Sequence, residues 1–116
     1  MSNFFARSLD IAARAGISPD KIVLDPGIGF GKTPEQSMTA LARLGELQSF
    51  GLPLLVGASR KRFISTVTPS APDQRLGGSI AAHLLAAQNG ARILRAHDVA
   101  ETVQALRVTA AIREQG

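Results

Sequence analysis

The sequence has 116 residues, of which 45% are hydrophobic, and a formal net charge of +4 at pH 7. A compact chain of this size buries roughly two-thirds of its unfolded surface, which is enough for one core. There is no run of about 18 apolar residues, which argues against a membrane span, and the N-terminus lacks the pattern of a secretory signal. The absence of cysteine excludes disulfides and thiolate metal sites, and we expect a cytoplasmic protein.

Helix-length amphipathic segments alternate with short apolar ones. Apolar side chains at helical spacing predict helices over residues 4–15, 34–48, 73–88 and 99–113. Strands are predicted at residues 21–25, 52–57 and 91–96, and the polar residues 65–72 are expected to form a mobile loop. This alternation is typical of parallel βα units, in which the carboxyl ends of the strands form one rim. Because a helix precedes the first strand, we expect the chain to be part of a longer βα series.

The first strand leads into a glycine-rich segment, Asp25–Lys32, which reads DPGIGFGK. A Walker phosphate loop would need glycine at Pro26, and the dinucleotide-binding pattern would need one at Lys32, so both fail by one position. The simpler interpretation is a tight turn from strand to helix. Asp25 is different, because a carboxylate ending an apolar strand is costly unless it is hydrogen-bonded or used.

Positive charge follows the second strand in Arg60–Lys61–Arg62. Three adjacent cations predict an anionic group nearby, although a solvated basic turn is the alternative. Nucleic-acid binding is disfavoured because the chain has no Tyr or Trp for stacking. After the third strand, Arg95 and His97 are two residues apart and project to one side, which suits an anion. We therefore expect a small anionic substrate.

Two helix starts carry the sequence pattern of a capping box, Thr33 with Gln36 and Asp98 with Glu101. On the helix before the third strand, the alanines between Ser79 and Ala87 form a small-residue surface for close contact with another element. His83 lies among them, and we expect a helix histidine with a local partner.

Four segments, DPGIGFGK, GASRKRF, RLGGSIAA and RAHDVAET, follow one another between about Ile22 and Thr102. Together they resemble the C-terminal half of the dihydropteroate synthase family. The methyltetrahydrofolate-dependent methyltransferases share the pterin-binding barrel but fit two of these segments less well. The resemblance implies an α/β fold that is part of a (β/α)8 TIM barrel. Residues 1–116 would form one C-terminal portion, with three parallel strands equivalent to strands six to eight and four to five helices. A full barrel needs about 250 residues.

The resemblance also implies a transferase of folate biosynthesis and a target of sulfonamides. This family joins para-aminobenzoate to 6-hydroxymethyl-7,8-dihydropterin pyrophosphate and releases pyrophosphate with Mg²⁺. By resemblance, Asp25, Lys61 and Arg95 would bind the pterin, and Arg95 and His97 the pyrophosphate. Phe30, Lys61 and Arg62 would border the aminobenzoate, although many relatives have serine at the position of Arg62. No covalent nucleophile is expected, and we expect no hydrolase geometry between Ser59 and His97.

The family's metal-binding first loop and half of its pterin contacts precede this segment of the barrel. We therefore expect no metal ligands in this chain and little or no activity from the chain alone. One alternative is a non-catalytic barrel fragment, which we expect to self-associate as a homo-oligomer because its sheet edges are open. Another is a generic phosphate-binding βα domain.

Overall fold

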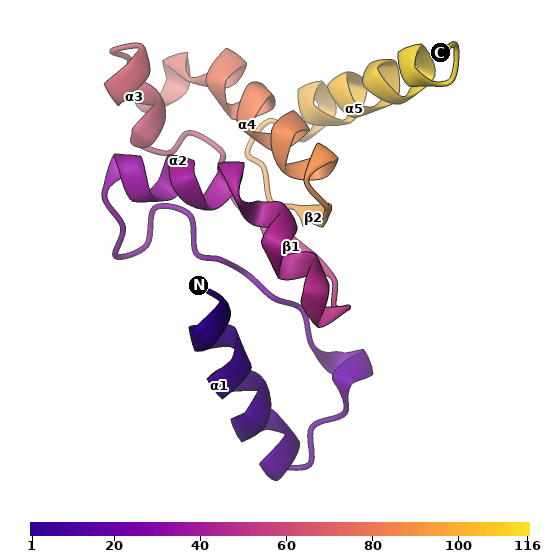
Figure 1. Cartoon of the computed structure of the whole chain (residues 1–116). Coiled ribbons are helices and arrows are strands. Elements are labelled where there is room, and N and C mark those ends of the chain that lie inside the picture. The colour runs from indigo at the N-terminus through magenta and orange to yellow at the C-terminus, as the bar shows by residue number, and fades with distance from the viewer.

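The computed structural model describes all residues from Met1 to Gly116 and contains five α-helices and a parallel two-stranded sheet (Figure 1). In chain order the elements are α1 (Ser2–Arg14), α2 (Pro34–Ala42), β1 (Leu54–Val56), α3 (Phe63–Val67), α4 (Leu76–Gln88), β2 (Ala91–Leu94) and α5 (Val99–Arg113). Short 3₁₀ helices cover Pro19–Lys21, Leu44–Phe50 and Pro72–Gln74. None of the helices combines the length and apolar character that a membrane crossing requires.

The sheet pairs β1 with β2 in parallel, with Leu54 opposite Ala91 and Val56 opposite Leu94. The connection between them runs through α3 and α4, and α4 packs against β2. The predicted βα alternation is therefore present, and the residues that follow both strands emerge at the same end of the sheet.

The first predicted strand, residues 21–25, is reduced to a single parallel bridge between Leu24 and Leu54. Leu24 N–H donates to the Pro53 carbonyl over 2.9 Å, and Leu55 N–H donates to the Leu24 carbonyl over 2.8 Å. Continuing this ladder in either direction would need an N–H from Pro26 or from Pro53, and proline has none. The three-strand arrangement is therefore not confirmed, because two prolines confine the pairing to one residue.

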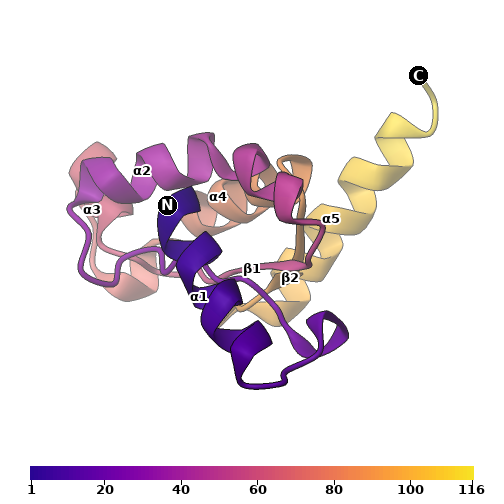
Figure 2. The same ribbon diagram turned by 60° about the horizontal axis from the view of Figure 1, so that its bottom comes forward.

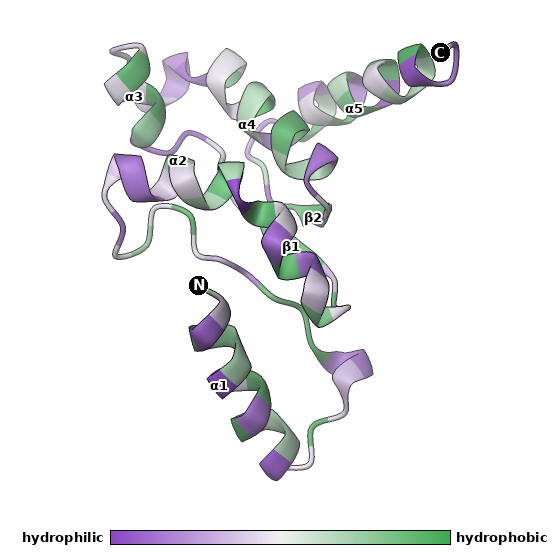
Figure 3. Cartoon of the chain, viewed as in Figure 1, coloured by the Kyte–Doolittle hydropathy of each residue, from purple (hydrophilic) through white to green (hydrophobic).

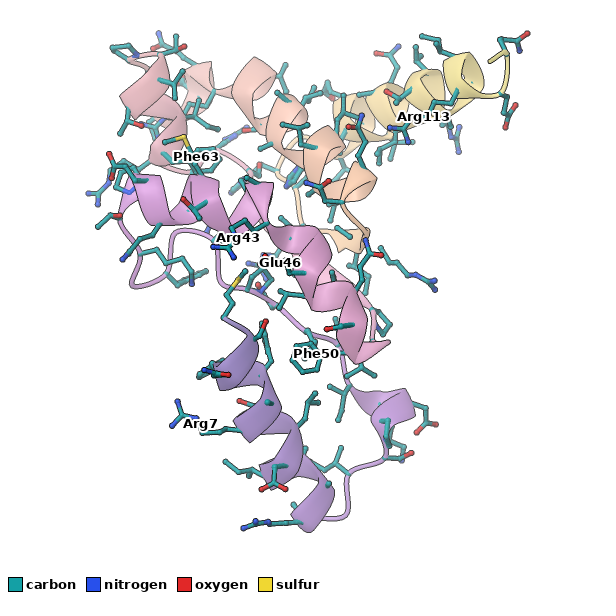
Figure 4. All side chains as sticks on the ribbon, in the orientation of Figure 1. Arg7, Arg43, Glu46, Phe50, Phe63 and Arg113 are labelled. Atoms are coloured by element: carbon teal, nitrogen blue, oxygen red, sulfur yellow. The ribbon has the colours of Figure 1, made fainter.

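The helix predicted over residues 34–48 is broken. It starts with the predicted capping box of Thr33 and Gln36, but α2 ends at Ala42 and the chain continues as a 3₁₀ helix. With three residues per turn, this geometry puts Leu44 and Leu47 on the same side, and both are completely buried. Arg43 and Glu46 form an ion pair of 2.9 Å on the exposed side (Figure 4).

The predicted mobile loop at residues 65–72 is partly wrong, because α3 extends to Val67 and buries Phe63 and Ile64. The next helix begins at Leu76 rather than Asp73. Gly78 in α4 lies so close to α3 that a Cβ there would be 2.5 Å from Ile64 Cγ2. The missing side chain at residue 78 thus allows α3 to pack on α4.

Helix α1 is set off from the other helices in Figure 1 and lies in front of the body in Figure 2, and a long segment that includes the 3₁₀ helix Pro19–Lys21 joins it to α2. Its hydrophobic and hydrophilic residues lie on different sides (Figure 3). Phe5 is its buried anchor, and the Phe5 ring contacts Phe50 edge to face at 6.2 Å between centroids. At the other end of the chain, α5 projects away from the body in both views.

Candidate functional site

The site lies where the chain leaves the carboxyl ends of β1 and β2. A cavity of about 180 Å³ opens there. It is lined by Gly57, Ser59, Lys61, Arg95, Ala96 and His97. The lining contains two cations and no carboxylate, which suits an anionic ligand.

Asp25 approaches this cavity from the segment that follows Leu24. One of its carboxylate oxygens accepts a hydrogen bond from Gly27 N–H over 2.8 Å, and the other lies 3.9 Å from Arg95 Nη1. Both side chains are solvent-accessible, so this loose ion pair contributes little to stability. The structure therefore brings Asp25 and Arg95 together while leaving both able to contact a ligand.

The Arg95 side chain lies over the backbone of Gly57, the residue after β1. The Arg95 backbone N–H donates to the Val56 carbonyl over 3.0 Å and so continues the pairing of the two strands. Sequence reasoning overlooked Gly57, because its importance depends on the register between β1 and β2.

Ser59 and His97 form a close pair, contrary to our expectation. Ser59 Oγ is 2.7 Å from His97 Nδ1 and also accepts a hydrogen bond from the His97 backbone N–H over 3.0 Å. The distance matches a nucleophile–base pair, but Ser59 is only 5% exposed and the same oxygen holds the histidine backbone. The geometry indicates that Ser59 orients the His97 ring toward the cavity.

Lys61, which lines the cavity, also contacts Phe30, with Lys61 Nζ 4.3 Å from the centre of the Phe30 ring. The glycine-rich loop packs against the stem of the lysine, because a Cβ at Gly29 would be 3.1 Å from Lys61 Cδ. Gly27, Gly29 and Gly31 all have positive φ, which only glycine adopts readily. The alternating glycines thus form the tight turn predicted as the simpler interpretation.

Arg62 is not in this cavity. It is exposed at the start of α3 and lines a neighbouring cavity of about 390 Å³, which Lys61 also lines. Lys32, Arg60 and Arg75 are further basic residues of that lining. The structure therefore separates Arg62 from Arg95 and His97, with Lys61 between the two cavities.

Arg60 has the anionic partner that the basic cluster predicted. Its guanidinium donates to the Asp98 carboxylate over 3.1 and 3.4 Å. This pairing makes the predicted capping box of Asp98 and Glu101 wrong, because the Asp98 side chain makes no cap to α5. Asp98 instead ties the start of α5 to the turn after β1.

His83 is completely buried and accepts a hydrogen bond at Nε2 from the Ala58 backbone N–H over 3.0 Å. Burial lowers the pKa of His83, so the ring is neutral at pH 7. We predicted a local partner, but this one is 25 positions away in the chain. The spacing of Ser79 and His83 on one side of α4 was the available signal, but the sequence does not reveal which element that side meets.

No three histidine or carboxylate side chains gather in the chain as a metal site would require. Asp25 lies beside the Arg95 guanidinium, which is a cation. The residues of this chain therefore do not fit a complete magnesium site.

The sequence profile of a family described as "Pterin binding enzyme" matches residues 1–97. The chain belongs to this family. Among curated members, it is 46% identical over 111 residues to dihydropteroate synthase of Escherichia coli K12, covering 96% of the chain and 39% of the relative. It is 44% identical over 113 residues to dihydropteroate synthase of Synechocystis, covering 97% and 39%. The chain thus spans about two-fifths of the length of these relatives.

Solved structures of family members have the same fold over this part of the chain. Dihydropteroate synthase of Yersinia pestis superposes with a TM-score of 0.93 at 44% identity, covering 97% of this chain and 46% of that one. The Xanthomonas albilineans enzyme in complex with 7,8-dihydropteroate gives 0.93 at 47% identity, with coverages of 96% and 43%. The same enzyme with 4-aminobenzoic acid gives 0.92 at 47% identity, with coverages of 96% and 41%. The fold described above is therefore that of part of a pterin-binding enzyme.

Proposed function

We propose that this chain is part of a dihydropteroate synthase, which condenses para-aminobenzoate with 6-hydroxymethyl-7,8-dihydropterin pyrophosphate in folate biosynthesis. The observation that carries the proposal is that Lys61, Arg95 and His97 line one cavity and that Asp25, from a third segment, lies beside Arg95. Relatives named for this activity match nearly the whole chain, and one structural neighbour is a complex with 7,8-dihydropteroate.

The pterin would lie between Asp25, Lys61 and Arg95. A carboxylate accepts hydrogen bonds, so Asp25 suits the amino-pyrimidine edge, which is rich in donors. Lys61 would donate to the pterin carbonyl. The planar guanidinium of Arg95 can stack on the flat heterocycle, and the side chain is 56% exposed.

The pyrophosphate would contact Arg95 and His97. The arylamine nitrogen of para-aminobenzoate attacks the methylene carbon of the pterin, the bond from that carbon to the pyrophosphate oxygen breaks, and the amine loses a proton. Negative charge grows on the departing pyrophosphate, where cationic and imidazole donors stabilise it. Catalysis then consists of positioning and charge stabilisation, and no residue acts as a covalent nucleophile.

The aminobenzoate would lie against the exposed ring of Phe30, near Lys61. Its carboxylate would extend toward Arg62 and the second, basic cavity that Lys61 borders. Mg²⁺ is part of the family's reaction, but the residues of this chain offer no fitting set of ligands for it.

Calorimetric titration of the chain with pyrophosphate, with a 6-substituted pterin and with para-aminobenzoate tests the proposal. We expect the pterin to bind, and Asp25→Asn to weaken pterin binding more than pyrophosphate binding. Arg95→Ala should weaken both, whereas Arg92→Ala, which removes an exposed arginine of β2, should weaken neither. Binding of pyrophosphate without any binding of pterin would instead support a generic phosphate-binding domain.

We further propose that the chain alone turns over little or no substrate, because part of the pterin site would come from elsewhere in the barrel. A turnover assay with both substrates is the direct test. A rate close to that of a full-length relative would contradict this part of the proposal.

We also propose that the isolated chain self-associates. Supporting this, an apolar cavity of about 550 Å³ opens between α2, α3 and α4, and Val67 and Leu85 on its lining are exposed. The surface predicted at Ser79–Ala87 is only half available, because Ala82 and Ala86 are buried within the chain.

Light scattering after size exclusion should show a dimer or larger species. Val67→Asp should shift it toward monomer more than Val108→Asp, a matched change on the exposed part of α5; a monomeric wild-type chain would refute this.

A further inference from the structure

Two polar side chains of α4 accept hydrogen bonds from the turn that follows β1. Ser79 Oγ accepts from the Arg60 backbone N–H over 2.7 Å, and His83 Nε2 accepts from the Ala58 backbone N–H over 3.0 Å. Residues four apart on a helix share a face, and both side chains are buried. Together they hold two alternate N–H groups of one short segment.

We propose that Ser79 and His83 are positioning residues, which fix the backbone from Ala58 to Arg60 so that Ser59 and Lys61 occupy their places in the candidate site. The inference rests on the proposed function for the meaning of those places. Its structural content is separate, because the two acceptors and the side chains they position are all within this chain.

The backbone of the turn requires such support. Arg60 has φ of +56°, a left-handed conformation that is uncommon for residues other than glycine. Ser79 holds its N–H, and Arg75 Nη1 donates to its carbonyl over 3.0 Å. With both peptide groups held, Ser59 meets His97 on one side of the turn while Lys61 meets Phe30 on the other.

Packing alone does not explain a histidine at residue 83. Because Nε2 accepts a hydrogen bond, the neutral ring carries its proton on Nδ1. Nδ1 is buried and has no hydrogen-bond partner, which is costly for a polar atom. A leucine would fill similar space without that cost, so the acceptor at Nε2 is the feature that distinguishes histidine here.

The test compares three substitutions of His83. Glutamine places its side-chain oxygen at about the position of Nε2, asparagine places its oxygen closer to the helix, and leucine supplies no acceptor. Two readouts need no ligand: hydrogen exchange at the Ala58 and Arg60 amides, and the NMR ring-current shift that Phe30 imposes on the Lys61 side-chain protons. The third readout is the affinity for inorganic pyrophosphate.

We expect His83→Leu and His83→Asn to speed exchange at Ala58 about tenfold and to reduce the Lys61 shift, while His83→Gln retains wild-type behaviour. Affinity for pyrophosphate should fall about tenfold in the first two variants, as for a lost contact to a charged group. A folded His83→Leu variant with the wild-type Lys61 shift and wild-type affinity would overturn the proposal.

Failure of the proposed function would look different, because the wild-type chain itself would then bind no pterin, whatever its affinity for pyrophosphate. The exchange and ring-current readouts would still decide whether the two residues position the turn. If His83→Leu does not fold, Ser79→Ala and its rescue by Ser79→Thr supply the same comparison at the Arg60 amide. An unchanged Lys61 shift in Ser79→Ala would then count against the proposal.

Discussion

The guanidinium of Arg95 lies directly against the backbone of Gly57, where a Cβ would come within 2.6 Å of Nη2 and 3.0 Å of Nε. Gly57 does not have a positive φ, so alanine suits its backbone and only the arginine must move. We predict that Gly57→Ala displaces Arg95 from Asp25 and lowers the affinity for pyrophosphate about tenfold. Titration calorimetry measures this effect, and thermal unfolding should show little change because Arg95 is largely exposed.

Gly45→Ala is the control for that substitution. A Cβ at Gly45 has the Asn89 carbonyl as its nearest neighbour, at 3.8 Å, which is an ordinary contact. It should leave the affinity for pyrophosphate unchanged. Equal affinities of wild type and Gly57→Ala would show that the position of Arg95 is unimportant for the anion.

Neighbouring glycines of α4 should respond in opposite directions to alanine. A Cβ at Gly77 meets no atom within 4 Å, whereas one at Gly78 collides with Ile64. Gly77→Ala should raise the free energy of unfolding by about 0.5 kcal/mol through helix propensity. Gly78→Ala should lower it by about 1–3 kcal/mol through overpacking. Urea denaturation of the two variants provides the measurement. A change in the free energy of unfolding that has the same sign in both variants would contradict the close packing of α3 on α4.

The capping box that opens α2 should contribute measurably to stability. Thr33 Oγ1 accepts from Gln36 N–H over 3.1 Å, and Gln36 Oε1 accepts from Thr33 N–H over 2.9 Å. Thr33→Ala removes one of these bonds and should cost about 1 kcal/mol. Thr39→Ala, an exposed change within the same helix, should be neutral or slightly stabilising in the same denaturation experiment. A cost shared by both variants would point away from capping.

Burial of His83 makes stability depend on pH in a defined direction. Its pKa is lowered in the folded chain, so the unfolded chain binds more protons once the pH falls below about 6.5. The contribution of His83 to the free energy of unfolding is therefore complete above that pH and declines as the pH falls toward the folded pKa. Denaturation of wild type and His83→Gln between about pH 5 and 8, on both sides of the reference pKa of about 6.5, isolates this contribution. A constant difference between the two proteins would contradict a buried neutral ring.

The sequence predicted the elements whose local signals agree. Helix α5 occupies the predicted residues 99–113, and the Thr33 capping box starts α2 as expected. The strand near Leu24 failed because pairing depends on its partner: Pro26 is visible in the sequence, but its effect on the ladder appears only once Leu24 is placed opposite Leu54. The break after Ala42 likewise reflects burial of Leu44 and Leu47, which helix periodicity does not distinguish.

For the site, the charged residues at the strand ends could be predicted because parallel strands bring those ends together. The contacts that arrange these residues could not be predicted from the sequence. Ser59 contacts His97 only because β1 and β2 are neighbours in one register. The Asp98 side chain pairs with Arg60 and does not cap α5. Such pairs join residues that are 38 positions apart, and no local pattern records them.

The two prolines that limit Leu24 to one bridge also leave its segment weakly paired with β1. Two backbone hydrogen bonds attach this residue to β1, whereas β1 and β2 pair over several residues. Although Leu24 and Ile28 are buried in the core, we expect this segment to open before the sheet does. Asp25 would leave with it, whereas Lys61 and Arg95 would remain. We therefore expect the carboxylate beside the cavity to be more mobile than the basic residues that line it.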